Sequence, residues 1–272
     1  MQVLQGNGSG GFTPLAATSV GIDPQSIDPE DLDNDRCLDL MVANAVSGTV
    51  TVLMNQKGTL VVVDEITVGN GPIDLASGDL DNDGDIDFAT ANNGSDSVSL
   101  LVNDGNGAFT AVPALAVGAA PTSVDAVDLN GDLALDLAVV ADDPVIGPSV
   151  QVLTNLGDLL AFEEPIAFSV DADPQFVVGV DLNNDGLADL VTANAEQVED
   201  GSVSALISVP TVFLCSGDEN GDGEVNVEDL VIVIVNWGDC PLPPDDCPGD
   251  VNDDGAVDVQ DLVEVVLGWG GC

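Results

Sequence analysis

Six acidic loops, each with oxygen-bearing side chains at alternating positions, are the part of this sequence best suited to chemistry. Four occur early: DLDNDRCLD at Asp31–Asp39, DLDNDGDID at Asp79–Asp87, DLNGDLALD at Asp128–Asp136 and DLNNDGLAD at Asp181–Asp189. Two longer ones follow, DENGDGEVNVED at Asp218–Asp229 and DVNDDGAVDVQD at Asp250–Asp261. A hard cation of the size of Ca²⁺ requires oxygen ligands arranged in this way on a tight loop. The sequence therefore predicts up to six calcium sites.

In the first four loops we expect side-chain ligands at positions one, three, five and nine, and a main-chain carbonyl ligand at position seven. These residues are Asp31, Asp33, Asp35, Cys37 and Asp39; Asp79, Asp81, Asp83, Asp85 and Asp87; Asp128, Asn130, Asp132, Ala134 and Asp136; and Asp181, Asn183, Asp185, Leu187 and Asp189. Position six needs a sharp turn, and Gly84 and Gly186 occupy it in two loops. Arg36 and Leu133 replace that glycine in the other two, so we rank those two sites lower.

The amino-acid composition excludes several functions. The chain has 49 Asp and Glu residues against two Lys and Arg, for a net charge of −47, which would repel nucleic acid and anionic membranes. Solvated Asp and Asn turns can form without an ion, but six copies in register favour metal binding. Because metal-free loops would repel one another, we expect folding to be coupled to the ion.

Catalysis is not predicted. The chain has no His, the commonest general base, and no Tyr. A carboxylate pair for glycoside hydrolysis could exist among 49 acids, but nothing distinguishes one pair from the metal ligands. The Cys37 thiol has no His or Lys near it in sequence and is read as a bystander. No stretch is long enough to cross a bilayer, and no signal peptide is visible, so we expect the chain to begin inside a longer protein.

The first four loops recur with a period near fifty residues, starting at Asp31, Asp79, Asp128 and Asp181. Each repeat has a proline-led strand before the loop, a short apolar strand after it, a second β-rich run and a last strand after an Asn/Gly turn. Four strands per period are typical of a β-propeller blade. The segment from Gln2 to Val20 matches Leu100–Val117, so the chain begins half-way through a blade. These N-terminal strands either complete the last sheet or mark an arc of a larger ring.

From Cys215 onward the pattern changes, and we expect helices after Asp229 and Asp261, because an acid at the twelfth loop position is typical of a loop that leads into a helix. The expected fold is mainly β, with about four propeller-type blades and a small α-helical module of duplicated loop-helix units. The expected domains are residues 1–208 and 215–272, joined by a linker at 209–214.

The loop D-x-[DN]-x-D-G-x-x-D followed by a short strand resembles the FG-GAP or VCBS repeat of integrin-type β-propellers, over about residues 1–210. The resemblance implies calcium sites on one rim of a ring that usually has seven blades. This chain has too few repeats for such a ring.

Residues 215–272 resemble a type I dockerin, a duplicated calcium module that docks secreted enzymes and adhesins onto cohesin domains. The resemblance implies the ligands Asp218, Asn220, Asp222, Glu224, Asn226 and Asp229, and Asp250, Asn252, Asp254, Ala256, Asp258 and Asp261, with Glu224 and Ala256 using their carbonyls. It implies partner-binding positions at Val227, Glu228, Val259 and Gln260, where the usual Ser/Thr pair is absent. Cysteines bracket each half, and among three pairings the duplication favours the disulfides Cys215–Cys240 and Cys247–Cys272.

Disulfides indicate an oxidising environment, so we expect a secreted or cell-surface protein. We interpret it as a calcium-binding, non-catalytic binding or adhesion protein, with a cohesin-like or other cell-surface partner and a glycan or protein ligand for the repeats. The alternative is the accessory C-terminal part of an extracellular carbohydrate-active enzyme that degrades polysaccharide and whose catalytic domain lies upstream.

Overall fold

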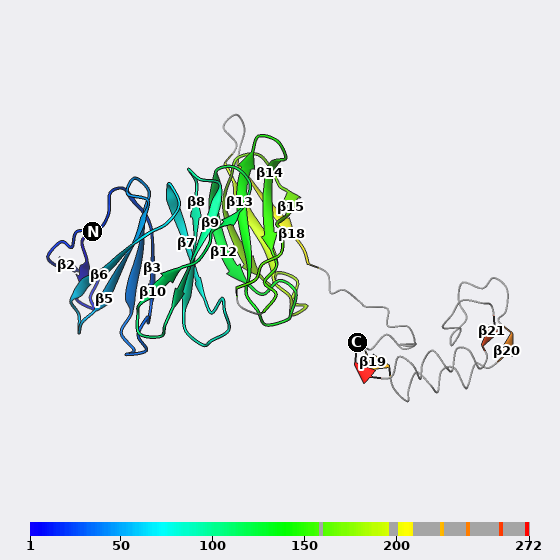
Figure 1. Cartoon of the computed structure of the whole chain (residues 1–272), viewed down its shortest axis with the longest axis horizontal. Helices are drawn as coiled ribbons and strands as arrows, with labels where there is room; N and C mark the ends of the chain where they lie inside the picture. The colour runs from blue at the N-terminus through cyan, green and yellow to red at the C-terminus, as the bar shows by residue number, and fades with distance from the viewer. Residues whose placement is uncertain are drawn as a thin grey trace. The chain divides into compact units, whose positions relative to one another are not determined.

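The computed structural model describes residues 1–157, 160–195 and 201–208, together with four two-residue strands farther along the chain. The chain divides into two compact units, Met1–Val209 and Pro210–Cys272, and each is considered by itself. The described part of the first unit consists of antiparallel β-strands joined by turns and loops (Figure 1). Among these described residues, none belongs to a helix with the length and hydrophobicity needed to cross a membrane.

Four antiparallel sheets follow one another along the first unit, and each begins with a strand that starts at a proline. The first sheet is β3 (Pro24–Glu30), β4 (Asp39–Asn44), β5 (Thr49–Asn55) and β6 (Leu60–Thr67). The second is β7 (Pro72–Gly78), β8 (Asp87–Asn92) and β9 (Ser97–Asn103), with both β10 (Phe109–Ala111) and β11 (Leu115–Ala116) paired to β9. The third is β12 (Pro121–Val127), β13 (Asp136–Asp143), β14 (Gly147–Leu153) and β15 (Ile166–Ser169), and the fourth is β16 (Pro174–Val180), β17 (Asp189–Asn194) and β18 (Ser202–Leu206).

The proline that opens each sheet has the same local effect four times. The register between the first and second strands shifts immediately after it, between Pro24 and Ser26 in the first sheet and at the equivalent residues of the other three. Proline has no N–H to donate to a ladder, and a bulge next to it lets the rest of the strand pair normally. The repeats predicted from the sequence therefore share their irregularities as well as their strands.

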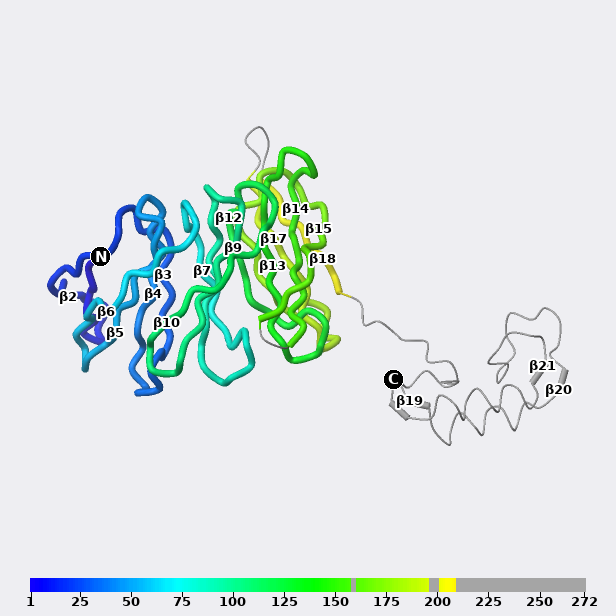
Figure 2. The backbone as a smooth tube through the Cα atoms, in the orientation of Figure 1, coloured from blue at the N-terminus to red at the C-terminus, as the bar shows by residue number. Residues whose placement is uncertain are grey.

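The sheets pack face to face in chain order, and Figure 2 shows the backbone of each beside that of the next. Three apolar clusters fill the spaces between them. One contains Met41, Val52 and Phe88, from the first and second sheets. The others lie between the second and third sheets and between the third and fourth. The expectation of a mainly β chain with four-stranded sheets like propeller blades is confirmed for this unit.

The N-terminal hairpin of β1 (Leu4–Gly6) and β2 (Phe12–Pro14) repeats the geometry of β9 and β10. Beyond the hairpin, the Leu15 N–H donates to the Val3 carbonyl at 2.9 Å, as the Val112 N–H does to Leu100 at 3.1 Å. Residues 4–14 thus form a hairpin like the one that makes the outer part of the second sheet. Of the two alternatives for its placement, completion of the last sheet is wrong for this structure, because β1 and β2 pair with each other and not with β16–β18.

The second unit is described at β19 (Glu224–Val225), β20 (Gly238–Asp239), β21 (Ala256–Val257) and β22 (Gly270–Gly271). Strand β19 pairs with β22 and β20 pairs with β21. Since β21 and β22 repeat β19 and β20 after 32 residues, the two pairings are equivalent: Glu224 faces Gly271 as Ala256 faces Asp239. Each half of the duplication therefore pairs with the end of the other half.

Most predictions for the second unit lie outside the described residues. These are the helices after Asp229 and Asp261, the four cysteines, the positions Val227, Glu228, Val259 and Gln260, and all predicted ligands except the carbonyl donors Glu224 and Ala256, which lie in β19 and β21.

Candidate metal centres

Each of the four N-terminal acidic loops joins the first and second strands of one sheet. The first strand ends at the residue before loop position one, and the second strand begins at position nine, as β3 ends at Glu30 and β4 begins at Asp39. The same holds for β7 and β8, for β12 and β13, and for β16 and β17. Because the four sheets stack in one orientation, the repeats present their loops in equivalent places.

The aspartate at position nine is buried in all four loops, with an exposed fraction of 1% or less at Asp39, Asp87, Asp136 and Asp189. One oxygen accepts the N–H of position two at 2.9–3.0 Å. The other accepts, at 2.6–2.9 Å, the N–H of a residue that either ends the third strand of the sheet or lies two residues beyond its end. Each oxygen keeps a second lone pair, so this carboxylate closes the loop and retains capacity for a cation.

The rest of each loop is wound around the position-one carboxylate. This carboxylate accepts the N–H of position six at 2.8–3.1 Å in every loop. Positions three and five each accept the N–H two residues further on, which is the hydrogen bond of an Asx turn, as at Asp33 and Asp35. Position six has φ between 71° and 96° whether it is Arg36, Gly84, Leu133 or Gly186. The sharp turn predicted at this position is confirmed, and its backbone is left-handed in all four loops.

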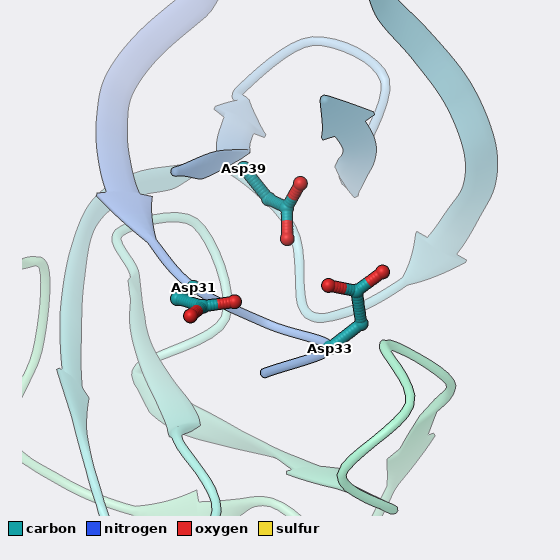
Figure 3. Close-up of side chains that lie close together, drawn as sticks. All are labelled: Asp31, Asp33 and Asp39. Carbon is teal, nitrogen blue, oxygen red and sulfur yellow. The ribbon is translucent and has the colours of Figure 1, made fainter. Parts of the chain in front are cut away.

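Carboxylates converge in the first two loops. Asp31, Asp33 and Asp39 each contribute one carboxylate oxygen to a group whose members all lie within 4.8 Å of one another. Figure 3 shows these three side chains turned toward a common space. The second loop brings Asp79, Asp81 and Asp87 together in the same way. In that loop the Oδ1 atom of Asp79 is buried and has no hydrogen-bond partner. These gathered anionic oxygens keep lone pairs that no N–H group occupies, and they therefore fit a divalent cation with oxygen ligands.

Burial makes several of these carboxylates costly to ionise. It raises the pKa of Asp87 from 3.8 to about 6, and it raises the pKa values of Asp39 and Asp136 in the same direction. Burial and then the charge of Asp83 raise the pKa of Asp81. At Asp189 burial acts in the same sense, but hydrogen bonds from Leu182 and Ser208 outweigh it and the pKa is lowered. A cation in the first two loops would relieve this unfavourable charge.

The third and fourth loops differ at position three, where Asn130 and Asn183 replace aspartate. The Asn130 amide donates to Asp132 at 3.1 Å, and the Asn183 amide donates to Asp185 at 2.9 Å. Each of these loops therefore has one carboxylate fewer, and the position-three amide occupies an oxygen of the position-five carboxylate. Among the residues that the structure describes, no carboxylate triad forms in these two loops.

Two predicted positions behave differently from the triads. The position-five carboxylates Asp35 and Asp83 lie outside the clusters of the first two loops. At position seven, the Cys37 thiol lies half-buried, and its hydrogen bond to Asp35, with burial and nearby carboxylates, raises its pKa. A thiol held protonated is a poor nucleophile, which supports its interpretation as a bystander.

The sequence analysis did not identify the residues near the ends of the third strands that hold the position-nine carboxylates. These are Asn55, Asn103, Asn155 and Ser208, which donate their N–H groups to the position-nine carboxylates. The signal in the sequence is weak but present, because a polar residue recurs at the close of each repeat's third strand, 16 or 19 residues after position nine.

Comparison with known proteins agrees with the repeats. A family model for the FG-GAP-like repeat matches residues 31–90 and 79–139, so this part of the chain contains FG-GAP-like repeats. No curated protein sequence matches the chain. Among solved structures it is similar to hydrazine synthase from Kuenenia stuttgartiensis, at 20% identity and a TM-score of 0.47, covering 70% of this chain and 48% of that one. It is also similar to BBS1N in a complex with ARL6DN soaked with lead, at 15% identity and a TM-score of 0.47, covering 68% of this chain and 57% of that one. The chain thus spans about half the length of these two structures.

Proposed function

We propose that this chain is a calcium-stabilised, non-catalytic binding protein that works outside the cell. The observation that carries the proposal is the repetition of one loop geometry four times, with carboxylate triads at Asp31–Asp39 and Asp79–Asp87. Oxygen ligands on a flexible loop suit Ca²⁺, whereas Mg²⁺ requires near-ideal octahedral geometry and dehydrates reluctantly. In these loops the ion would neutralise buried carboxylates and fix the closed conformation.

Calorimetry of the full chain tests this proposal directly. Chelation should lower the melting temperature of the first unit, and added Ca²⁺ should restore it while equimolar Mg²⁺ restores little. In a variant with Asp79→Asn and Asp81→Asn, added Ca²⁺ should raise the melting temperature by less than it does in the parent. Asp64→Asn and Asp104→Asn, which change exposed acids outside the loops, serve as the matched control for charge. Equal melting temperatures with and without chelator would contradict the proposal.

For the second unit we propose a dockerin-like module that attaches the protein to a cohesin-like domain or another cell-surface partner. The reciprocal pairing of β19 with β22 and of β20 with β21 supports it, because two equivalent halves that pair with each other's ends form one duplicated module. The repeats of the first unit would then present a ligand-binding surface to a glycan or a protein.

The docking surface is tested with the oxidised, calcium-loaded full chain and immobilised cohesin domains. Val227→Asp together with Val259→Asp should abolish binding, because the substitutions put a charge at one apolar partner-binding position in each half of the module. Val63→Asp, at a 48% exposed valine on β6, is the control for an added surface acid and should bind normally. Undiminished binding by the double variant would place the docking surface elsewhere.

A further inference from the structure

A continuous path of buried hydrogen bonds runs from the first acidic loop to the third, across two sheet interfaces. It begins in the first loop, where the Leu32 N–H donates to Asp39 at 3.0 Å. The carbonyl of the same Leu32 accepts the side-chain amide of Asn103, also at 3.0 Å, although Asn103 belongs to the next sheet. The N–H of Asn103 donates to Asp87, the position-nine carboxylate of the second loop, at 2.9 Å.

The same connection repeats from the second loop to the third. The Leu80 N–H donates to Asp87 at 3.0 Å, and the Leu80 carbonyl accepts the Asn155 side-chain amide at 2.8 Å. The Asn155 N–H then donates to Asp136 of the third loop at 2.8 Å. Every residue on the path from Asp39 to Asp136 has an exposed fraction of 2% or less. Water therefore cannot easily replace any of its bonds.

The orientation of both asparagine side chains is fixed by their other partners. The Asn103 carbonyl oxygen accepts the N–H groups of Gly105 and Gly107 at 3.2 and 3.1 Å, and that of Asn155 accepts the Gly157 N–H at 3.1 Å. The amide NH₂ groups are thus left to face the carbonyls of the preceding loop. Each asparagine holds its own position-nine carboxylate through its main chain and the neighbouring loop through its side chain.

The path ends where the asparagine is replaced. In the fourth sheet the equivalent residue is Ser208, whose N–H still donates to Asp189 at 2.8 Å. Its hydroxyl bonds to Ala188 and Asp189 within its own repeat, so nothing from this residue reaches the third loop. Asn55 provides a second comparison, because its amide donates to Leu38 in its own repeat at 3.1 Å.

We propose that Asn103 and Asn155 are positioning residues that couple the first three acidic loops, so that ordering one loop orders its neighbour, while the fourth loop responds independently. The inference rests on the proposed calcium function for its effect on binding. Ordering the Leu32–Asp33 peptide fixes the position of Asp33, a predicted ligand. The side chain of Asn103 anchors this peptide, and the main chain of Asn103 holds Asp87. A loop already ordered by its neighbour loses less conformational freedom when it binds an ion, which gives positive cooperativity.

Residue-resolved amide exchange on the full chain tests the coupling, because the Leu32, Leu80, Leu129 and Leu182 N–H groups are equivalent reporters of the four loops. In metal-free protein, Asn103→Ser should speed exchange at Leu32 by about twofold to tenfold, the effect of losing one hydrogen bond. Asn155→Ser should do the same at Leu80 and provides an independent test where Asn103→Ser fails to fold. Asn55→Ser should leave Leu80 unchanged.

A second arm adds calcium at high salt, where repulsion between bound ions is screened. Disabling the second loop with Asp79→Asn and Asp83→Asn should weaken protection at Leu32 in the parent but not in the Asn103→Ser background. Disabling the fourth loop with Asp181→Asn and Asp185→Asn should leave Leu129 unaffected. If calcium protects none of the reporters, the calcium function is wrong and the metal-free arm alone decides the coupling. Unchanged exchange at Leu32 in metal-free Asn103→Ser and at Leu80 in Asn155→Ser overturns the proposal.

Discussion

The turn at loop position six offers a clean test, because two loops have glycine there and two do not, while all four share the same backbone conformation. Gly84 has φ of 96° and Leu133 has φ of 74°. A β-carbon added at Gly84 would meet no atom within 4 Å, and Leu133 is 84% exposed, so neither substitution changes packing. Exchanging the residue types should therefore alter only the cost of a left-handed backbone.

That cost is about 1–2 kcal/mol for a residue with a side chain, and the greater freedom of glycine in the unfolded chain offsets roughly 0.5–1 kcal/mol of it. We expect Gly84→Ala to destabilise and Leu133→Gly to stabilise the first unit, each by about 0.5–1 kcal/mol. For a unit of this size the melting temperature should fall or rise by about 1–4 °C. Gly186→Ala and Arg36→Gly are the matched second pair, since their φ angles are 91° and 71°.

Differential scanning calorimetry at saturating Ca²⁺, repeated with chelator, measures all four variants under one set of conditions. The sign is the decisive quantity, because Ala for Gly and Gly for Leu should act in opposite directions at equivalent positions. If Leu133→Gly lowers the melting temperature as much as Gly84→Ala does, backbone strain at position six is not what distinguishes the loops.

Three further predictions concern the first unit. Metal-free protein should become more stable as the pH falls from 7 to 5. The folded pKa of Asp87, about 6, lies above the ordinary 3.8, so the stability that is present at low pH is lost as the pH rises through the folded pKa. Asp87 alone should contribute roughly 1 kcal/mol over that range, and calorimetry of Asp87→Asn should show a flatter pH profile; an equally steep one would exclude this residue as the cause. Under limiting calcium, the ion should fill the second loop most, because that loop has both Gly84 and an aspartate triad. It should fill the third loop least, because that loop has neither a glycine at position six nor a triad, and equal occupancy of the four loops would contradict this order. Phe88→Ala should cost about 3–5 kcal/mol in chemical denaturation, since Phe88 is fully buried and lies edge-to-face on Phe109 at 5.9 Å, whereas Phe176→Ala, at a 53% exposed residue, should cost far less.

The sequence predicted those features that depend on short spacings. Alternating acids placed the loops, and the prolines before them placed the first strands at Pro72–Gly78, Pro121–Val127 and Pro174–Val180, the bounds that the structure has. The ranking by glycine alone was incomplete, because it ignored position three. Asn130 and Asn183 looked like acceptable oxygen ligands in the sequence, and only the geometry shows that their amide groups donate to a neighbouring carboxylate.

Features that depend on how the sheets stack were beyond the sequence. Asn103 and Asn155 are separated from their partners Leu32 and Leu80 by 71 and 75 residues, and no local pattern links them. Each could be read as a polar residue opening a turn, which it also is, since its carbonyl oxygen binds the glycines of that turn. The second role arises because face-to-face packing brings the end of one sheet's third strand beneath the preceding loop. By the proposed coupling, order passes from one repeat to the next at these asparagines, and the path ends at Ser208, whose hydroxyl bonds only within its own repeat.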